Sequence, residues 1–527
     1  MAPVTERRQR WEVVGLLGAL ALLVGLTYAD YGITWDETVE LFRRHKGPRT
    51  LAFWLDGFDP DNAPFDTGHN PFVWFVYYSL FRMMETLGVA PAQIEAYHLF
   101  TGLIGVLGIG FAYRVARQLM PHRWALAAAL LVALTPRLCG HAFGNFKDIP
   151  FAVAWLASLD TLLRAVAAPT RRNVLWHGVA IGALIVQRIG GLMFAPLSLL
   201  GLVLALRSPA SPGVSALARH ALIAVCIALG LHYVSYPYLL LRPIDGLVRL
   251  ISIQSAFAWD GVTLTLGIPM AAEGLPVWYG AIWLLVTLPE VVLGGLVAGT
   301  AAALLRRRPH FRRRPPSAAL GLTIASALLP FAWISLSRAP IYDGARHLLF
   351  VIPPLVLLAM VGWRTLQSHL RGPAIPVILA ASGLVLAVQI VRLHPYQTVW
   401  FNSLVGGLDG ADERWTLDYW ATTAKASADW LGEHGQAPRT LCVVGALEDT
   451  WRVYLPDDWS IEDENDAGGC SRTAHYLWSY SRNDELRQSA AFAAGETRWS
   501  EVFRVERSAT PLGILWRNDR PVTGLER

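Results

Sequence analysis

The sequence predicts an all-α polytopic membrane protein that carries a small C-terminal α/β domain outside the membrane. Hydrophobic residues make up 54% of the 527 residues and charged residues only 16%, which excludes a disordered chain, a coiled coil and an ordinary cytosolic enzyme. Four cysteines are too few for a disulfide scaffold. Residues 1–408 hold 32 Lys and Arg against 19 Asp and Glu, whereas residues 409–527 hold 13 against 21. We therefore expect a membrane body at 1–408 and a soluble domain at 409–527.

The membrane body is expected to hold about eleven transmembrane helices, because apolar runs near the ~20 residues that cross the hydrocarbon core recur through it. Residues 174–206 are also compatible with one long kinked helix, which would invert the topology of everything after it. The first run is too long for a cleaved signal peptide, so we expect a retained anchor. The expected spans are 11–29, 96–117, 124–138, 150–168, 174–188, 190–206, 219–236, 277–300, 318–336, 347–363 and 374–391.

The placement of arginine orients these spans. Cytoplasmic loops are the ones rich in Lys and Arg, so we expect a protein of the inner (plasma) membrane with a cytoplasmic N-terminus and a periplasmic or extracellular C-terminal domain. The positive charge lies in the loops of a membrane body, so membrane lipids are expected partners and nucleic acid is not. Arginines gather on the expected inner side, at 7–10, 114–123, 164–172, 207–219, 306–314 and 364–371.

The longest outer loop, residues 30–95, opens with Asp36 and Glu37 directly after the first span. A carboxylate at a membrane edge is desolvated on one side, which raises its pKa unless a cation or metal compensates. Such a group can serve as a general base or a metal ligand. The alternative is a helix cap, because Thr34 followed by Glu37 fits a capping box, and both interpretations are compatible if Glu37 caps and Asp36 stays free.

The same loop later holds His69, Asn70 and Pro71, followed by an aromatic stretch at 72–87. Aromatic rings prefer the membrane interface, so we expect a short helix that lies in the interface. A full span at this position would place the arginine-rich loops outside, which the charge distribution argues against.

Two further outer positions carry charge beside a span. Lys147, one of only three lysines in the chain, precedes Asp148; the alternative here is a surface ion pair of little energetic value. Arg188 lies between two spans, and ionisable residues within a membrane are candidates for functional sites. Its alternative is a side chain that extends to the headgroups.

The last outer segment before the tenth span contains Tyr342, Asp343, Arg346 and His347. Arg346 is a fixed cation at the outer edge, and its planar guanidinium suits a phosphate. Carboxylates beside cations at a lipid boundary suit a reaction on a lipid-linked phosphate, with cations on the phosphate and a carboxylate that accepts a proton. A transporter would instead place such groups near the middle of the bilayer, between paired broken helices, and the sequence shows no such pattern.

The sequence resembles the polytopic glycosyltransferases that use polyprenyl-phosphate sugars, the GT-C fold, within the protein-mannosyltransferase and aminoarabinose-transferase-like group (family 39-like). The order and spacing of the motifs along the chain, from about residue 30 to 430, carry the resemblance. These motifs are Trp35-Asp36-Glu37, His69-Asn70-Pro71, Asn145 to Pro150, Tyr342 to His347 and the segment Tyr396 to Trp430.

The resemblance implies roles for particular residues. Asp36 would be the catalytic base or a metal ligand, with Glu37 as its partner and Asp148 as the acid of the second loop. Asn70 stands where the related pattern usually has Pro, which puts the use of His69 in question. A divalent metal is left open, with Asp36 and Asp148 as candidate ligands. His69 and the segment after it would border the donor phosphate, and Arg346 or Arg188 would bind it. The residues expected to bind substrate are His69, Asn70, Lys147, Arg188, Tyr342, Arg346 and His347.

The resemblance also implies an activity. We expect a sugar to pass from a polyprenyl-phosphate donor to a lipid, glycan or protein acceptor on the outer face, in one displacement that inverts the anomeric carbon. The alternative is a transporter or flippase that moves a lipid-linked sugar without forming a glycosidic bond.

The C-terminal domain is expected to begin with a helix near 419–433, followed by strands at 440–446, 474–480, 500–506 and 512–517. Cys442 and Cys470 would lie in an oxidising compartment, but their spacing does not decide whether they pair. The acidic run 462–466 is compatible with a solvated turn or with a divalent-cation loop.

Overall fold

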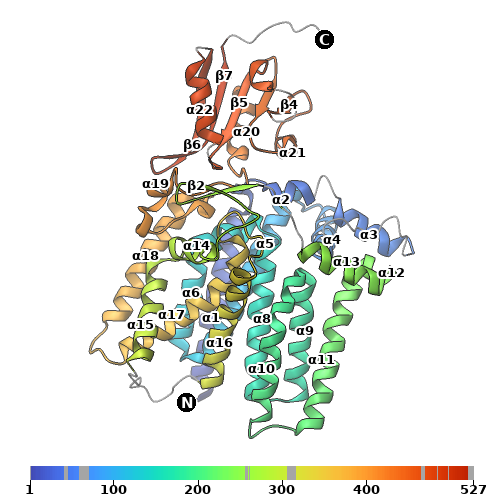
Figure 1. The fold of residues 1–527 in the computed structure, drawn as a ribbon, viewed down its shortest axis with the longest axis vertical. Helices are drawn as coiled ribbons and strands as arrows, with labels where there is room; N and C mark the ends of the chain where they lie inside the picture. The colour runs from blue at the N-terminus through green and yellow to red at the C-terminus, as the bar shows by residue number, and fades with distance from the viewer. Residues whose placement is uncertain are drawn as a thin grey trace.

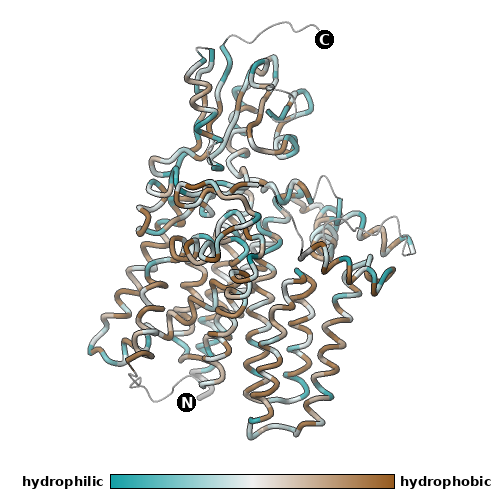
Figure 2. Tube along the Cα trace, in the orientation of Figure 1, coloured by the Kyte–Doolittle hydropathy of each residue, from teal (hydrophilic) through white to brown (hydrophobic). Residues whose placement is uncertain are grey.

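A helical body with a smaller sheet domain at one end makes up the computed structural model (Figure 1). The structure describes residues 2–40, 45–57, 71–255, 259, 261–305, 316–464, 469–483, 485–496 and 498–519. The first helix begins at the end of the body opposite the sheet domain. The helices of the body are coloured mostly as hydrophobic in Figure 2.

Eight helices of the described residues are long and apolar enough to cross a membrane, and up to ten if each of two bent pairs is one span. The protein is therefore an integral membrane protein with multiple spans. The eight are α1 (Ala2–Thr27), α5 (Gln93–Leu119), α8 (Asp148–Ala167), η4 with α10 (Ile189–Phe194 and Ala195–Leu206), α11 (Val214–Ser235), α16 (Ser317–Leu336), η5 with α17 (Arg346–Val351 and Ile352–Gln367) and α18 (Ala374–Leu393).

The segment 174–206 forms two antiparallel helices rather than one kinked helix. α9 (Arg171–Gln187) has 17 residues, at the lower limit for a membrane span, and it lies between α8 and α11 in Figure 1. His177 Nε2 lies 3.0 Å from Ser198 Oγ, 21 residues further along the chain. A continuous helix would separate these residues by about 30 Å, so the chain reverses between α9 and α10 and the order of the later helices is as predicted.

Two of the expected spans are broken, which corrects the expectation that the chain has no paired broken helices. Residues 124–138 become α6 (His122–Ala133) and α7 (Pro136–Gly144), which are bent by 61°. Residues 277–300 become α14 (Tyr279–Thr287) and α15 (Glu290–Leu304), which are bent by 114°. Proline lacks an N–H and clashes with the preceding turn, and Pro136 and Pro289 stand at these breaks.

Short elements gather at the end of the body that faces the sheet domain (Figure 1). The helix predicted at 72–87 is present as α4 (Phe72–Thr86), which packs against α3. The others are η1 (Tyr28–Asp30), α2 (Trp35–Thr38), α3 (Lys46–Leu55), α12 (Pro237–Leu241), α13 (Pro243–Ser255), the antiparallel strands β1 (Val262–Thr265) and β2 (Ile268–Ala271), η6 (Gln397–Val399), η7 (Ser403–Val405) and α19 (Gly407–Ala411).

The C-terminal domain is a mixed five-stranded sheet in the order β4-β3-β5-β7-β6 with three helices. The parallel strands β3, β4 and β5 alternate with helices, whereas β6 and β7 form an antiparallel hairpin. Its elements are α20 (Ala424–His434), β3 (Thr440–Val443), α21 (Glu448–Arg452), β4 (Ser460–Asp463), η8 (Cys470–Arg472), β5 (Tyr476–Tyr480), α22 (Glu485–Gly495), β6 (Trp499–Arg507) and β7 (Thr510–Asn518). The predicted helix and strands recur here, while β4 and α22 were not predicted.

A disulfide joins Cys442 in β3 to Cys470, with the two Cα atoms 5.6 Å apart. The pairing that the sequence left open is therefore present. The acidic run 462–466 lies partly in β4 and partly outside the described residues. Glu464 accepts hydrogen bonds from the Ser471 backbone N–H (2.8 Å) and Oγ (2.8 Å), so it joins the two sides of the disulfide-closed loop.

Candidate active site

A cavity of about 1020 Å³ opens where the helical body meets the C-terminal domain. Its walls come from α2, the start of α8, the break between α9 and η4, the end of α16, the turn before η5, and the C-terminal region. Segments far apart in the sequence thus share one space. The sequence-predicted residues that line it are Asp36, Lys147, Asp148, Arg188, Tyr342, Arg346 and His347.

Asp36 lies in the first turn of α2, where it meets two cations from distant segments. Its Oδ2 is 2.9 Å from Arg346 Nη1 and 3.6 Å from Lys147 Nζ. The carboxylate is partly exposed, at 22% of its side chain. Asp36 is therefore both paired and accessible from the cavity.

Glu37 points away from the cavity, although it follows Asp36 directly. It completes a capping box: Thr34 N–H donates to Glu37 Oε2 (2.9 Å), and Glu37 N–H donates to Thr34 Oγ1 (3.2 Å). The same Oε2 lies 3.3 Å from His98 Nε2 of α5, and both side chains are buried. The structure therefore places Glu37 as a cap rather than beside Asp36 in the cavity wall.

Asp148 begins α8 and is held on both sides. Asp148 N–H donates to Asn145 Oδ1 (2.8 Å), and Asn145 Nδ2 donates to Asp148 Oδ2 (3.1 Å). Its other oxygen forms an ion pair with Arg188, the residue at which α9 ends. The charge of Arg188, which lies between α9 and η4, is therefore neutralised by Asp148 at the start of α8.

The turn 342–347 places Arg346 at the centre of the cavity wall. Arg346 is 5% exposed; besides Asp36, it pairs with Asp343 Oδ2 at 3.5 Å, and its guanidinium lies 4.7 Å from the centre of the Tyr342 ring. Asp343 has a φ of 54°, in the left-handed region. Burial raises the pKa of the Asp343 carboxyl above its ordinary value, and the charges of Arg346 and Arg482 oppose that rise.

Several lining residues were not predicted as site residues from the sequence. Glu40, one turn after Asp36, pairs with Lys147 at 3.4 Å and with the buried Lys46 at 2.6 Å; its spacing from Asp36 was the available signal. Trp35, Tyr419 and Trp420 also line the cavity; they lie within the motifs that carry the family resemblance, although no role was predicted for them. Nothing in the sequence marked Trp259, Arg338 or Arg482, which reach the cavity only through tertiary packing.

Tyr419 and Trp420 are held in place by a buried acid. Asp418 accepts hydrogen bonds from the N–H groups of Trp420 (3.3 Å) and Thr423 (3.2 Å). Trp420 O in turn accepts from Trp35 N–H at 3.2 Å. Burial raises the pKa of Asp418, while these hydrogen bonds oppose the rise. The segment that leads into the C-terminal domain is thereby fixed against the residue that precedes Asp36.

In the described part of the chain, the carboxylates of the cavity do not form a group of three or more ligand atoms close enough to share a metal ion. Asp36 and Asp148 each pair with an arginine. Among the described residues, the group of acid, imidazole and thiol atoms close enough to share an ion is Cys442, Glu464 and Cys470, where the two cysteines are bonded to each other. His69 and Asn70 lie outside the described residues.

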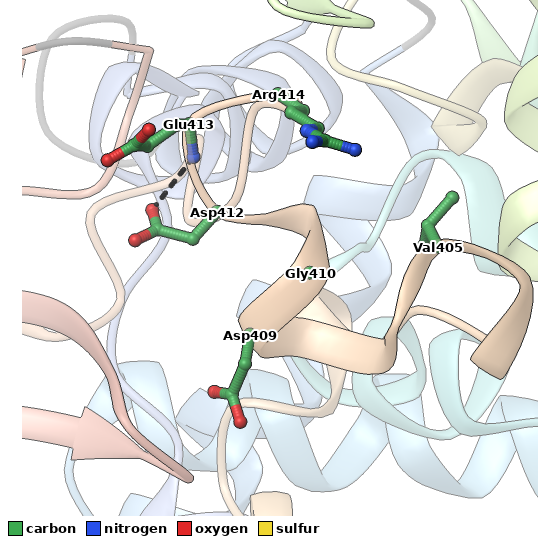
Figure 3. Close-up of a pocket in the computed structure, with 6 residues that line it drawn as sticks. All are labelled: Val405, Asp409, Gly410, Asp412, Glu413 and Arg414. Atoms are coloured by element: carbon green, nitrogen blue, oxygen red, sulfur yellow. Dashed lines mark hydrogen bonds between the residues drawn. The ribbon is translucent and has the colours of Figure 1, made fainter.

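A second hollow of about 310 Å³ lies on the segment that follows α18 (Figure 3). Its lining contains none of the predicted site residues. Two of its acids, Asp412 and Glu413, pair with Arg487 of α22, so they tie α22 to the segment between α19 and α20. The lining residues are Val405, Asp409, Gly410, Asp412, Glu413 and Arg414.

The structure thus has a helical body with multiple membrane spans and a charged cavity beside a small mixed sheet domain. Residues 76–238 match the family model of dolichyl-phosphate-mannose-protein mannosyltransferases, a segment that includes Lys147, Asp148 and Arg188. The match covers less than half of the chain and agrees, over those residues, with the protein-mannosyltransferase resemblance drawn from the sequence. No curated protein sequence matches the chain.

Solved structures of glycosyltransferases are similar to the chain over most of its length. ArnT from Cupriavidus metallidurans, bound to undecaprenyl phosphate, is 17% identical to this chain with a TM-score of 0.49. The match covers 95% of this chain and 97% of the ArnT chain. The oligosaccharyltransferase AglB from Archaeoglobus fulgidus, in complex with an inhibitory peptide and a dolichol-phosphate, is 13% identical with a TM-score of 0.45, covering 98% and 75%. The mycobacterial arabinofuranosyltransferase AftD is 14% identical with a TM-score of 0.41, covering 97% and 42%.

Proposed function

We propose that this protein is a membrane glycosyltransferase that moves a sugar from a polyprenyl-phosphate donor to an acceptor hydroxyl at the outer face of the membrane. The observation that carries the proposal is one cavity in which Asp36, Asp148, Lys147, Arg188 and Arg346 converge. The family model matched by residues 76–238 is named for a dolichyl-phosphate mannose donor, which supports this donor class.

The charge of the cavity suits a phosphodiester. The described lining residues carry four carboxylates (Asp36, Glu40, Asp148, Asp343) against five Lys and Arg, which leaves one positive charge in excess. A polyprenyl-phosphate sugar carries one negative charge on its diester. Guanidinium groups bind such oxygens through paired N–H donors, and Arg188 and Arg346 supply them.

One side of the cavity is apolar and open. Leu192, Ile251 and Trp333 line it and are 45%, 45% and 68% exposed. In a protein of this class, such side chains face lipid, so a polyprenyl chain can enter there with its phosphate next to Arg188. A nucleotide sugar has no apolar chain to bury against this surface, so the surface favours a lipid-linked donor.

The proposed step is a single displacement. The acceptor oxygen attacks the anomeric carbon, the bond from that carbon to the phosphate oxygen breaks, and the lipid phosphate leaves with the bonding electrons. Asp36 accepts the proton of the acceptor hydroxyl. Because Arg346 holds Asp36 in the free site, a donor phosphate that engages Arg346 weakens that ion pair and frees the carboxylate to act as the base.

The test is product formation with defined donors. Purified protein in nanodiscs is incubated with undecaprenyl-phosphate mannose, glucose or aminoarabinose and a membrane lipid extract, and products are identified by mass spectrometry. We expect one donor to yield a new glycoside and undecaprenyl phosphate. Intact donors that only exchange between leaflets would contradict the proposal and support a flippase.

The two bent helix pairs are a feature that a transporter would share. Asp36, Asp148 and Arg346 lie in neither pair, and they gather at the end of the body beside the C-terminal domain. This placement favours surface chemistry on a lipid headgroup over transport through the centre.

A further inference from the structure

Arg482 reaches the cavity from the C-terminal domain. It follows β5, and its side chain is 12% exposed. The guanidinium lies over two rings, with its carbon 5.3 Å from the centre of Trp35 and 5.5 Å from that of Trp259. The C-terminal domain thus contributes a cation to the wall of the cavity that contains Asp36.

Arg482 and Arg346 are linked twice. Trp259 stacks on Tyr342 with ring centres 4.1 Å apart, so the order Arg482, Trp259, Tyr342, Arg346 forms one continuous stack. Asp343 closes the arrangement, since its Oδ2 meets Arg346 at 3.5 Å and its Oδ1 meets Arg482 at 3.8 Å. Arg482 is therefore held at a fixed offset from the arginine that we assign to the phosphate.

Arg482 Nη2 and Asp343 Oδ1 lie too far apart to hydrogen-bond each other. A separation of 3.8 Å exceeds hydrogen-bonding distance, and Asp343 Oδ1 is buried with no hydrogen-bond partner among the described residues. Buried polar atoms are normally hydrogen-bonded. A guanidinium has five N–H donors, so the pair can hydrogen-bond a polar ligand with a small movement of either side chain.

The surroundings favour a neutral, hydroxyl-rich ligand. The two acids Asp36 and Asp343 offset the two arginines Arg346 and Arg482, and the aromatic faces of Trp35 and Trp259 flank the Arg482 guanidinium. Carboxylate and guanidinium groups bind hydroxyls as acceptor and donor, and aromatic faces pack against the C–H groups of a sugar ring. A second anion would find no excess positive charge at this end.

We propose that Arg482, with Asp343 and the Trp259 ring, forms the subsite that binds the sugar of the donor and selects among sugars. This inference rests on the proposed function and adds a specificity role for the C-terminal domain. A site built to hydrogen-bond a substrate hydroxyl discriminates strongly against analogues that lack it.

The test compares binding of two probes to the full-length protein in nanodiscs, followed by tryptophan fluorescence. The probes are undecaprenyl phosphate and undecaprenyl phosphate carrying mannose, glucose or aminoarabinose. The Kd for undecaprenyl phosphate divided by the Kd for the sugar-carrying lipid measures how much the sugar strengthens binding. We expect this ratio to be at least about tenfold for one sugar in the wild type and to fall most of the way to one in Arg482→Gln, because the variant removes the charged donor that would hydrogen-bond the sugar.

Matched variants separate this role from others. Arg188→Gln should weaken the binding of both probes equally and leave the ratio unchanged. Arg504 is an exposed arginine of the C-terminal domain, and Arg504→Gln should change neither Kd. If Arg482→Gln does not fold, Asp343→Asn provides the same comparison. An unchanged ratio in Arg482→Gln, or no sugar with a ratio above one in the wild type, overturns the inference. Failure of bare undecaprenyl phosphate to bind would instead count against the proposed function.

Discussion

The charged residues of the cavity occur in opposed pairs, which determines how single substitutions will act. Asp36 pairs with Arg346, Asp148 with Arg188, and Glu40 with Lys147. Removing one member of a buried pair leaves its partner uncompensated, at a cost of several kcal/mol. Substitutions that keep the size of the side chain are therefore the informative ones, and each needs a folding control.

We expect Asp36→Asn to lower kcat by about 10²–10⁴-fold, the usual contribution of a positioned general base. The amide keeps the shape of the side chain but accepts no proton. Product formation by mass spectrometry measures the effect, and size-exclusion chromatography checks the fold. Asp30→Asn is the matched control, because Asp30 is half exposed and pairs with His394 instead. Full activity of Asp36→Asn in folded protein would remove this residue from the mechanism.

We expect Arg188→Gln to raise the Kd for undecaprenyl phosphate by about 10–100-fold, since a hydrogen bond to a charged group is worth about 1.5–3 kcal/mol. Arg188→Lys should recover part of the affinity, because it keeps the charge but not the paired donors. Titration in nanodiscs measures both. Equal affinity in wild type and Arg188→Gln would show that this side chain only neutralises Asp148.

The sequence was sufficient to predict cavity residues that stand beside the ends of membrane spans. Asp36, Asp148 and Arg188 are of this kind. Placing a charge beside a membrane span costs free energy, so such a residue stands out in the sequence as a functional candidate. Glu37 was not separable from Asp36, since adjacent helix residues look alike in sequence yet point about 100° apart. Arg482 was beyond reach, because a soluble domain holds many arginines and only tertiary packing selects one.

At the scale of elements, short helices with defined starts position the site. α2 is only four residues long, so its direction depends on the capping box at Thr34 and on the contact of Glu37 with His98. The broken spans are a related case: hydropathy predicts that residues 277–300 are apolar, but it does not show a bend of 114°. Pro289 was the available signal for that bend.

We expect Glu37→Ala to lower the free energy of unfolding by about 1–3 kcal/mol, from the loss of a cap and of a buried hydrogen bond. Glu37→Gln, which retains a capping side chain, should lose less. Thermal unfolding measures stability, and turnover per folded molecule should fall far less than in Asp36→Asn. A folded Glu37→Gln protein without turnover would assign Glu37 to the chemistry.

At the scale of the whole molecule, the C-terminal domain is bound to the body at several separate points. Tyr454 OH accepts from Ile33 N–H at 2.6 Å, just before α2. Asn483 Oδ1 accepts from Leu264 N–H of β1 at 3.1 Å. Composition predicted a separate acidic domain, but contacts between domains leave no pattern in a single sequence.

The disulfide gives a prediction at this scale. Closing a loop of 28 residues stabilises a domain by about 3–4 kcal/mol in the chain-entropy treatment. We expect the double variant Cys442→Ala/Cys470→Ala to lower the unfolding temperature of the C-terminal domain and, through Arg482, the affinity for the sugar. Differential scanning calorimetry measures the first effect. Cys226→Ala, at an exposed and unpaired position, is the control and should change neither.

The cavity is lined by residues of α2 and by residues that follow α18, and this has a consequence for biogenesis. Tyr419, Trp420 and Arg482 line it, yet the ribosome makes them only after every membrane helix is complete. A nascent chain that has inserted all its helices would therefore still have an unfinished pocket. Folding of the final segment would then be the step that completes the site to which we assign the proposed function.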